Sequence, residues 1–106
     1  MVNSIRKGKV GEREWANYCK QFGFAVRRTQ QYAGGTEESA DCIGLPNIHQ
    51  EVKRVEKLNI YEAIEQAQND SKGKLPIVAH RRNNKEWLVT MRADDWFEIY
   101  KGFREV

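Results

Sequence analysis

Apolar residues in the first quarter of the chain recur at near-helical spacing, which predicts a helix over residues 8–22. Gly23 follows the last periodic residue and is typical of a helix end. Residues 24–28 then favour a strand. Residues 29–40 are polar and contain glycine, so they predict a loop that is long for a compact domain.

The middle of the chain predicts a hairpin followed by a helix. Residues 41–45 and 48–55 are strand-like, and Pro46-Asn47 between them favours a turn. The apolar residues of 61–70 recur on one side of a second helix.

Two further strands and a short helix complete the predicted domain. Residues 75–80 form a nearly continuous apolar run, typical of a strand covered on both faces, and residues 87–91 favour another strand. Asp94 or Asp95 is expected to cap a last helix over about residues 93–101. The order predicts an α/β fold with a mixed central β-sheet flanked by α-helices, in a single domain over residues 1–106 with its core in about 5–91.

Composition narrows the class of protein without identifying it. The chain has 106 residues, of which 40% are apolar and 31% are charged, and its net charge is +3. These values are typical of a globular domain and exclude a disordered chain. Basic residues crowd the first 28 positions and form a second group over residues 72–85. Two such groups favour a positive face that suits a phosphate backbone, although ordinary solvated side chains are the alternative.

Cys19 and Cys42 have neither CxxC nor Cys/His spacing, which argues against a zinc site. A disulfide between them stays open at this point, although buried thiols are the commoner arrangement. The amino terminus has no apolar signal region and no apolar run approaches membrane-spanning length, so we expect an intracellular, cytoplasmic protein without membrane contact.

The predicted hairpin brings chemically useful side chains together. Glu51 and Lys53 are two positions apart on a strand and leave by the same face, while Val52 points into the core. Asp41 begins the partner strand and returns close to Glu51. Two neighbouring carboxylates are costly to bury unless a cation joins them, and Mg²⁺ or Mn²⁺ prefers such oxygen ligands. The expected chemistry is metal-assisted hydrolysis, in which Lys53 orients the metal-bound water or stabilises the transition state.

The same short pattern of an acidic residue, any residue and lysine recurs at Asp70-Ser71-Lys72, at a predicted helix end. The pattern alone is therefore weak, and a decorated surface hairpin is the alternative for Glu51 and Lys53. His49 has no partner at metal-ligand spacing.

Several blocks in order resemble the archaeal-type Holliday junction resolvases of the PD-(D/E)xK nuclease superfamily. They span roughly residues 5–82 and are Arg6-Lys7-Gly8, Gly11-Glu12-Arg13-Glu14, residues 23–28, Ala40-Asp41-Cys42-Ile43, Glu51-Val52-Lys53 and residues 75–79. The resemblance implies a restriction-endonuclease-like fold and a homodimer that binds four-way junction or other branched DNA. It also implies Mg²⁺-dependent hydrolysis, with Mn²⁺ as a substitute.

The resemblance also implies roles for single residues. Asp41 and Glu51 correspond to the main metal ligands, the Val52 carbonyl to a third ligand, and Lys53 to the catalytic lysine. Glu12 corresponds to an additional acidic residue near the metal, and a plain helix-surface glutamate is its alternative. Many nucleases of this superfamily have a glutamine on the helix after the motif that faces the site, which makes Gln66 a weak further candidate, with a solvated helix residue as the alternative. The residues expected to bind DNA phosphates are Lys7, Arg13, Arg28, Arg81 and Arg82.

Two departures from the family pattern concern the first acidic residue and the preceding loop. Ala40 precedes Asp41 where the family has proline, which spares the ligand itself. The loop carries Glu37 and Glu38 where relatives are basic or serine-rich, and Thr36 or Ser39 could take the role of a loop serine. Substrate choice is therefore open: flaps, ends or duplex DNA are alternatives to a junction, and a non-catalytic DNA-binding module is a further one.

Overall fold

The computed structural model describes residues 4–29, 31–32, 35–36 and 40–104, and for residues 4–7, 31–32 and 35–36 it describes the backbone alone. Its elements, in chain order, are α1 (Ser4–Lys20), β1 (Arg27–Arg28), β2 (Gln31–Tyr32), β3 (Gly35–Thr36), β4 (Cys42–Ile43), β5 (Ile48–Arg54), α2 (Ile60–Asp70), β6 (Leu75–Arg81), β7 (Leu88–Thr90) and α3 (Ala93–Arg104).

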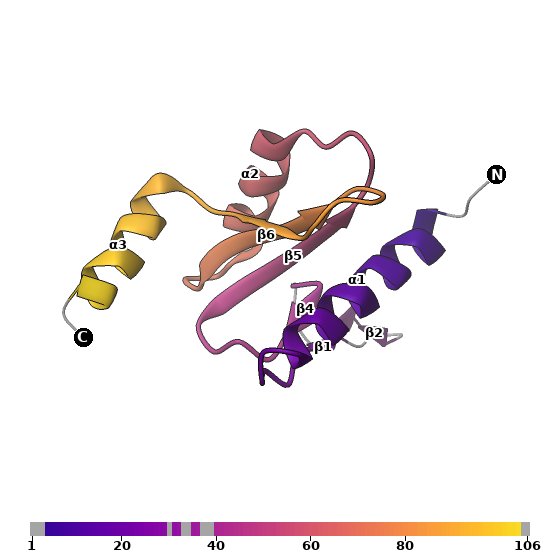
Figure 1. Cartoon of the computed structure of the whole chain (residues 1–106), viewed down its shortest axis with the longest axis horizontal. Helices are drawn as coiled ribbons and strands as arrows, with labels where there is room; N and C mark the ends of the chain where they lie inside the picture. Colours follow the sequence, from indigo (N-terminus) through magenta and orange to yellow (C-terminus); the bar gives the residue numbers. More distant parts are fainter. Residues whose placement is uncertain (1–3, 30, 33–34, 37–39, 105–106) are drawn as a thin grey trace.

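A five-stranded mixed sheet organises the chain, in the order β1-β4-β5-β6-β7. Figure 1 shows its central strands β5 and β6 side by side. The β5–β6 pair is parallel, joined by α2, and the other neighbours are antiparallel. The predicted α/β class with a mixed sheet and helices is confirmed. Among the described residues, no helix is long and apolar enough to cross a membrane.

The two helices next to the sheet lie on opposite faces of β5. Trp15 of α1 donates a hydrogen bond to Gln50, whereas Gln66 of α2 accepts one from Lys53. Because even and odd positions of a strand point to opposite faces, these two contacts put α1 on one side and α2 on the other.

Helix α1 differs from its prediction at its start and on its apolar side. It begins at Ser4, four residues before the expected start, because the polar first turn carries no apolar period to reveal it. It ends at Lys20, and Gly23 follows with a φ of 89° that favours glycine. Val10 and Phe22, two of the apolar residues whose spacing predicts this helix, are exposed and not packed in the core.

Two short elements in the region before the site differ from the prediction. The first strand is restricted to Arg27–Arg28 instead of residues 24–28. The expected loop over residues 29–40 contains a small antiparallel hairpin of β2 and β3, in which Gln31 pairs with Thr36. Such two-residue strands leave no periodicity to detect. Glu37, Glu38 and Ser39 lie outside the described residues.

The turn between β4 and β5 has the residues that its geometry requires. The Ile48 amide donates to the Leu45 carbonyl, with Pro46 and Asn47 between them, and Asn47 has a φ of 68°. Proline first and asparagine at positive φ second is the pattern of a type II turn. Gly44 has a φ of 123°, and a Cβ there would lie 2.5 Å from the Ala25 carbonyl oxygen.

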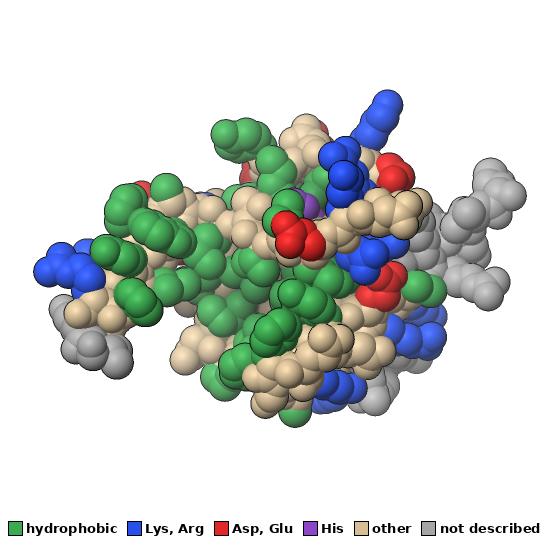
Figure 2. Space-filling view, viewed as in Figure 1, with side chains coloured by type: hydrophobic (Ala, Val, Ile, Leu, Met, Phe, Trp, Pro, Cys, Tyr) green, Lys and Arg blue, Asp and Glu red, His purple; other side chains and the backbone are tan. Residues whose placement is uncertain are grey.

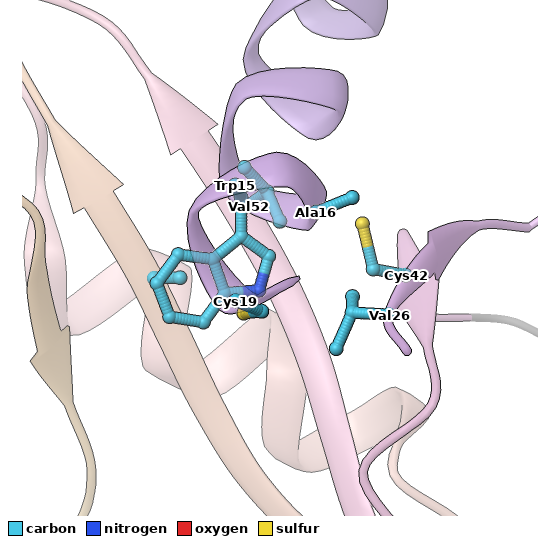
Figure 3. Packing of buried hydrophobic residues seen from close by; sticks show 7 residues of the cluster. Trp15, Ala16, Cys19, Val26, Cys42 and Val52 are labelled. Atoms are coloured by element: carbon cyan, nitrogen blue, oxygen red, sulfur yellow. The ribbon is translucent and has the colours of Figure 1, made fainter. Parts of the chain in front are cut away.

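The main core lies between α1 and the sheet, and Figure 3 shows its packing. It consists of Trp15, Ala16, Cys19, Val26, Cys42, Val52 and Ala79. Both cysteines are free and buried, and burial raises the pKa of the Cys19 thiol to about 11. A smaller cluster of Ala63, Ala67 and Val78 joins α2 to the other face.

Helix α3 begins at Ala93 and has no buried residue. Figure 1 shows it leading away from the sheet after β7. The predicted cap is wrong: Asp94 and Asp95 lie within the first turn, and the Asp95 carboxylate accepts two hydrogen bonds from the Arg92 guanidinium. The acidic first turn still suits the positive end of the helix dipole.

Candidate active site

The central strand β5 presents Glu51 and Lys53 on the face that α2 covers, as the alternation predicts. Lys53 Nζ lies 3.2 Å from Gln66 Oε1, so α2 holds the end of the lysine side chain. Val52 points the other way, into the core with Trp15. Gln66, a weak candidate from the sequence, therefore belongs to this cluster through Lys53.

Asp41 lies next to β5, one residue before β4, and extends the pairing of β4 with β5 by one residue. Its backbone amide donates to the Gln50 carbonyl at 2.9 Å. Its side-chain Oδ2 accepts a hydrogen bond from the Val52 backbone amide at 2.9 Å. The carboxylate is thereby fixed next to the Glu51-Val52-Lys53 segment, and the expected convergence of Asp41 with Glu51 is confirmed.

Burial dominates the electrostatics of these two carboxyl groups. Burial first, and the charge of Glu51 second, raise the pKa of Asp41 to about 6, although the hydrogen bond from the Val52 amide lowers it. Burial also raises the pKa of Glu51, against a lowering by the hydrogen bond with Asp41 and by the charge of Lys53. Glu51 is only 2% exposed. Burial and mutual repulsion therefore make it costly to ionise both carboxyl groups, a cost that a bound cation would reduce.

His49 is a member of the cluster that sequence reasoning missed. Its Nε2 lies 2.8 Å from Glu51 Oε1, and its side chain is 1% exposed. The signal was available, since positions 49 and 51 share a face of β5, but metal-ligand spacing was the wrong criterion for a histidine that contacts the glutamate. Asp70, set aside as part of a second motif, also raises the pKa of Glu51 through its charge.

Glu12 approaches the site from α1 and forms an ion pair with an arginine side chain. Arg28 Nε lies 2.9 Å from Glu12 Oε1, and both side chains are partly buried. The pKa of Glu12 is raised by burial above all, and lowered by the hydrogen bond from Arg28. The negative charge of Asp41 also raises the pKa of Glu12, so the two carboxyl groups interact electrostatically. Arg28, predicted to bind DNA, is engaged in this ion pair.

The donor chemistry of the cluster suits a hard divalent cation, since Asp41 and Glu51 offer carboxylate oxygens that are costly to bury together. Each carboxylate also has a partner within the protein: Asp41 has the Val52 amide, Glu51 has His49, and Glu12 has Arg28. Within the described part of the chain, no group of three or more histidine, cysteine or acidic side chains is arranged to hold a metal ion. Two of the expected ligands are together, and Glu12 is not gathered with them.

The predicted DNA-binding residues fall into two kinds. Arg13 and Arg82 are exposed. Arg81 instead contacts Glu14 at 3.2 Å and lies over the Trp87 ring, 5.9 Å from its centroid. The side chain of Lys7 lies outside the described residues. Figure 2 shows Lys and Arg side chains on the side of the molecule where the first half of α1 and the β6–β7 turn lie, with acidic side chains among them, and a separate basic group at the far end of α3.

No protein-family model matches the chain, and no curated protein sequence matches it either.

Proposed function

We propose that this protein is a metal-dependent endonuclease that hydrolyses phosphodiester bonds in branched DNA, with Mg²⁺ as its cofactor and Mn²⁺ as a substitute. The observation that carries the proposal is the buried Asp41–Glu51 pair beside Lys53. Burial and mutual repulsion raise the pKa of Asp41 to about 6, a cost that a bound divalent cation would remove.

Each residue of the cluster has a role in this proposal. Asp41 and Glu51 would hold the cation, which, when bound, polarises the phosphate and activates water. Lys53, oriented by Gln66 at 3.2 Å, stabilises negative charge that develops on the phosphate. His49 fixes the rotamer of Glu51 through its 2.8 Å contact.

The substrate class is proposed from three features together. The mixed five-stranded sheet is compatible with the restriction-endonuclease-like fold, the ordered blocks resemble Holliday junction resolvases, and the basic side suits a phosphate backbone. A homodimer fits a four-way junction because two sites related by a two-fold axis can cut a two-fold substrate symmetrically.

A cleavage assay tests the proposal. The full chain is incubated with labelled four-way junction, flap and linear duplex DNA, in Mg²⁺, in Mn²⁺ and in EDTA. We expect junction cleavage in either metal, none in EDTA, and a single-turnover rate lowered by about 100-fold or more in Asp41→Asn and in Lys53→Ala. Lys72→Ala is the matched control, because Lys72 belongs to the second acidic-x-lysine motif and is exposed.

One observation favours a second candidate, a DNA-binding module without catalysis. Glu12 is neutralised by Arg28, and only two of the expected acidic ligands are together. In that case the wild type binds junctions and cuts none of the three substrates in either metal. Equal cleavage of linear duplex and junction would instead keep the nuclease and refute the junction preference.

A further inference from the structure

Helix α3 exposes an aromatic stripe that nothing in the described chain covers. Its members are Trp96, Phe97, Ile99, Tyr100 and Phe103, each more than 40% exposed. Four of the rings form a ladder, with centroid distances of 5.0 Å from Trp96 to Phe97, 5.3 Å from Trp96 to Tyr100 and 6.2 Å from Tyr100 to Phe103.

The spacing of these residues gives the helix one apolar side. Positions 96, 99, 100 and 103 follow the i, i+3, i+4, i+7 pattern that lines one face, whereas Glu98 and Lys101 lie on the opposite side and pair with each other at 3.3 Å. An amphipathic helix of this kind is stable when its apolar face is packed, because helices of this length are marginal alone in water. Figure 2 shows this hydrophobic surface along α3 continuing onto the neighbouring body of the molecule.

The amount of exposed apolar surface fits an interface between two copies. Five large side chains that are about half exposed present on the order of 500 Å² per copy, since an aromatic residue buries about 150–250 Å² when fully covered. Two such surfaces together reach roughly 1,000 Å², the size at which specific interfaces begin.

The charges of α3 favour an antiparallel pairing with an identical helix. Acidic side chains, Asp94 and Asp95, occupy its first turn, and basic side chains, Lys101 and Arg104, occupy its last turn. Two antiparallel copies bring the acidic end of one helix beside the basic end of the other and oppose their dipoles, whereas a parallel pair aligns like charges. A two-fold axis near the middle of the helix generates this arrangement from one surface.

We infer that α3 is a dimerisation arm: the aromatic stripe of one copy packs antiparallel against the stripe of a second copy, across a two-fold axis near Ile99. This identifies the interface of the homodimer proposed above. It needs neither metal nor DNA, so it stands or falls separately from the nuclease activity.

Self-association of the full chain, measured by sedimentation without DNA or metal, tests the inference. We expect a dimer for the wild type and for Asp41→Asn, and self-association at least about 30-fold weaker in Tyr100→Glu and in Phe103→Glu. Tyr61→Glu is the matched control, because Tyr61 is an aromatic residue of α2 that is 87% exposed, and it should leave the dimer intact. The stripe lies outside the core, so circular dichroism should show the sheet unchanged in every variant.

Disulfide trapping tests the orientation. In an antiparallel pair Ile99 lies near its own copy, whereas Phe103 faces the region of Trp96, so Ile99→Cys should cross-link on oxidation and Phe103→Cys should not. The native Cys19 and Cys42 are buried and do not compete. A wild type that is monomeric at every concentration, or a dimer unaffected by both glutamate variants, refutes the arm. Cross-linking by Phe103→Cys alone refutes the antiparallel arrangement.

Discussion

Asp41 is the residue at which stability and the proposed function conflict. Its carboxyl group accepts the Val52 amide and faces the buried Glu51, an arrangement that suits a neutral side chain better than a charged one. An asparagine would accept from Val52 with its oxygen and donate to Glu51 with its nitrogen, as the protonated aspartic acid does. It would, however, supply no negative charge to a cation.

Asp41→Asn should therefore stabilise the metal-free protein at pH 7, by up to about 3 kcal/mol, because the pKa of Asp41 rises from 3.8 to about 6 on folding. The folded state holds this proton more tightly, so the stability that it contributes is complete below pH 4 and is lost as the pH rises through 6. Urea unfolding of both proteins between pH 4 and 8 measures this. Equal stability of the two at pH 7 would contradict the assignment.

Divalent cations should stabilise the wild type but not Asp41→Asn. A ligand that binds only the folded state raises its stability by mass action, and Mg²⁺ or Mn²⁺ in excess should raise the Tm of the wild type by several degrees. Thermal unfolding with and without the metal, and with Ca²⁺ as a further oxygen-seeking ion, gives the comparison. An equal rise in both proteins would point to a site elsewhere.

For single residues, the sequence predicts which face of a strand a side chain occupies but not which group it hydrogen-bonds with. Period two was enough to place Glu51 and Lys53 on one face and Val52 in the core. The His49–Glu51 contact left a local signal, because the two residues share a face of β5. The contacts Glu12–Arg28 and Lys53–Gln66 join distant segments through tertiary packing, and no local pattern records which of the available polar groups is chosen.

Among the elements, α1 is positioned by a close approach to β5. A Cβ built on Gly11 would lie 2.5 Å from the Arg54 Cβ, so the helix crosses the strand at a point where only glycine fits. Because Glu12 follows Gly11 in the helix, this close approach also determines where Glu12 lies relative to the site.

Gly11→Ala should destabilise the protein by about 1–3 kcal/mol, because either α1 or Arg54 must shift to admit the methyl group. Gly8→Ala is its control in the same helix, with nothing within 4 Å of the added Cβ, and should be neutral or stabilising by up to about 1 kcal/mol. The urea midpoints of the two variants show whether the effect at Gly11 comes from the steric clash with Arg54 or from helix propensity alone. A loss of equal size in both would exclude the close approach as the cause.

The elements that the sequence predicted well are those with an apolar rhythm or a turn signature. Strands β5 and β6, helix α2 and the Pro46-Asn47 turn differ from their predictions by a residue or two at most. The polar start of α1 at Ser4 and the hairpin of β2 and β3 lack such a rhythm, because tertiary context and not local pattern determines them.

For the whole molecule, basic residues differ in how available they are to a polyanion. If the protein binds DNA as proposed, Arg82→Ala should weaken binding by a similar factor for all sequences and lower the slope of log K against log salt by about 1, because Arg82 is exposed and would contact a single phosphate. Arg81→Ala should instead lower stability, since Arg81 joins Glu14 and Trp87. Binding titrations between low and moderate salt, with unfolding curves, separate the two; identical salt slopes for wild type and Arg82→Ala would refute the contact.

The parallel pair β5–β6 with α2 between them is a unit of consecutive residues, 48–81, so its contacts close short loops and should form early and open last. Glu51 and Lys53 belong to this unit, whereas Asp41 and Glu12 reach the site from segments that dock onto it. Amide hydrogen exchange should accordingly be slowest in β5 and β6 and faster in α1 and at Cys42. Detachment of α1 and β4 would then separate the carboxylates while the central strands remain folded, so cleavage activity should be lost on heating before the molecule unfolds.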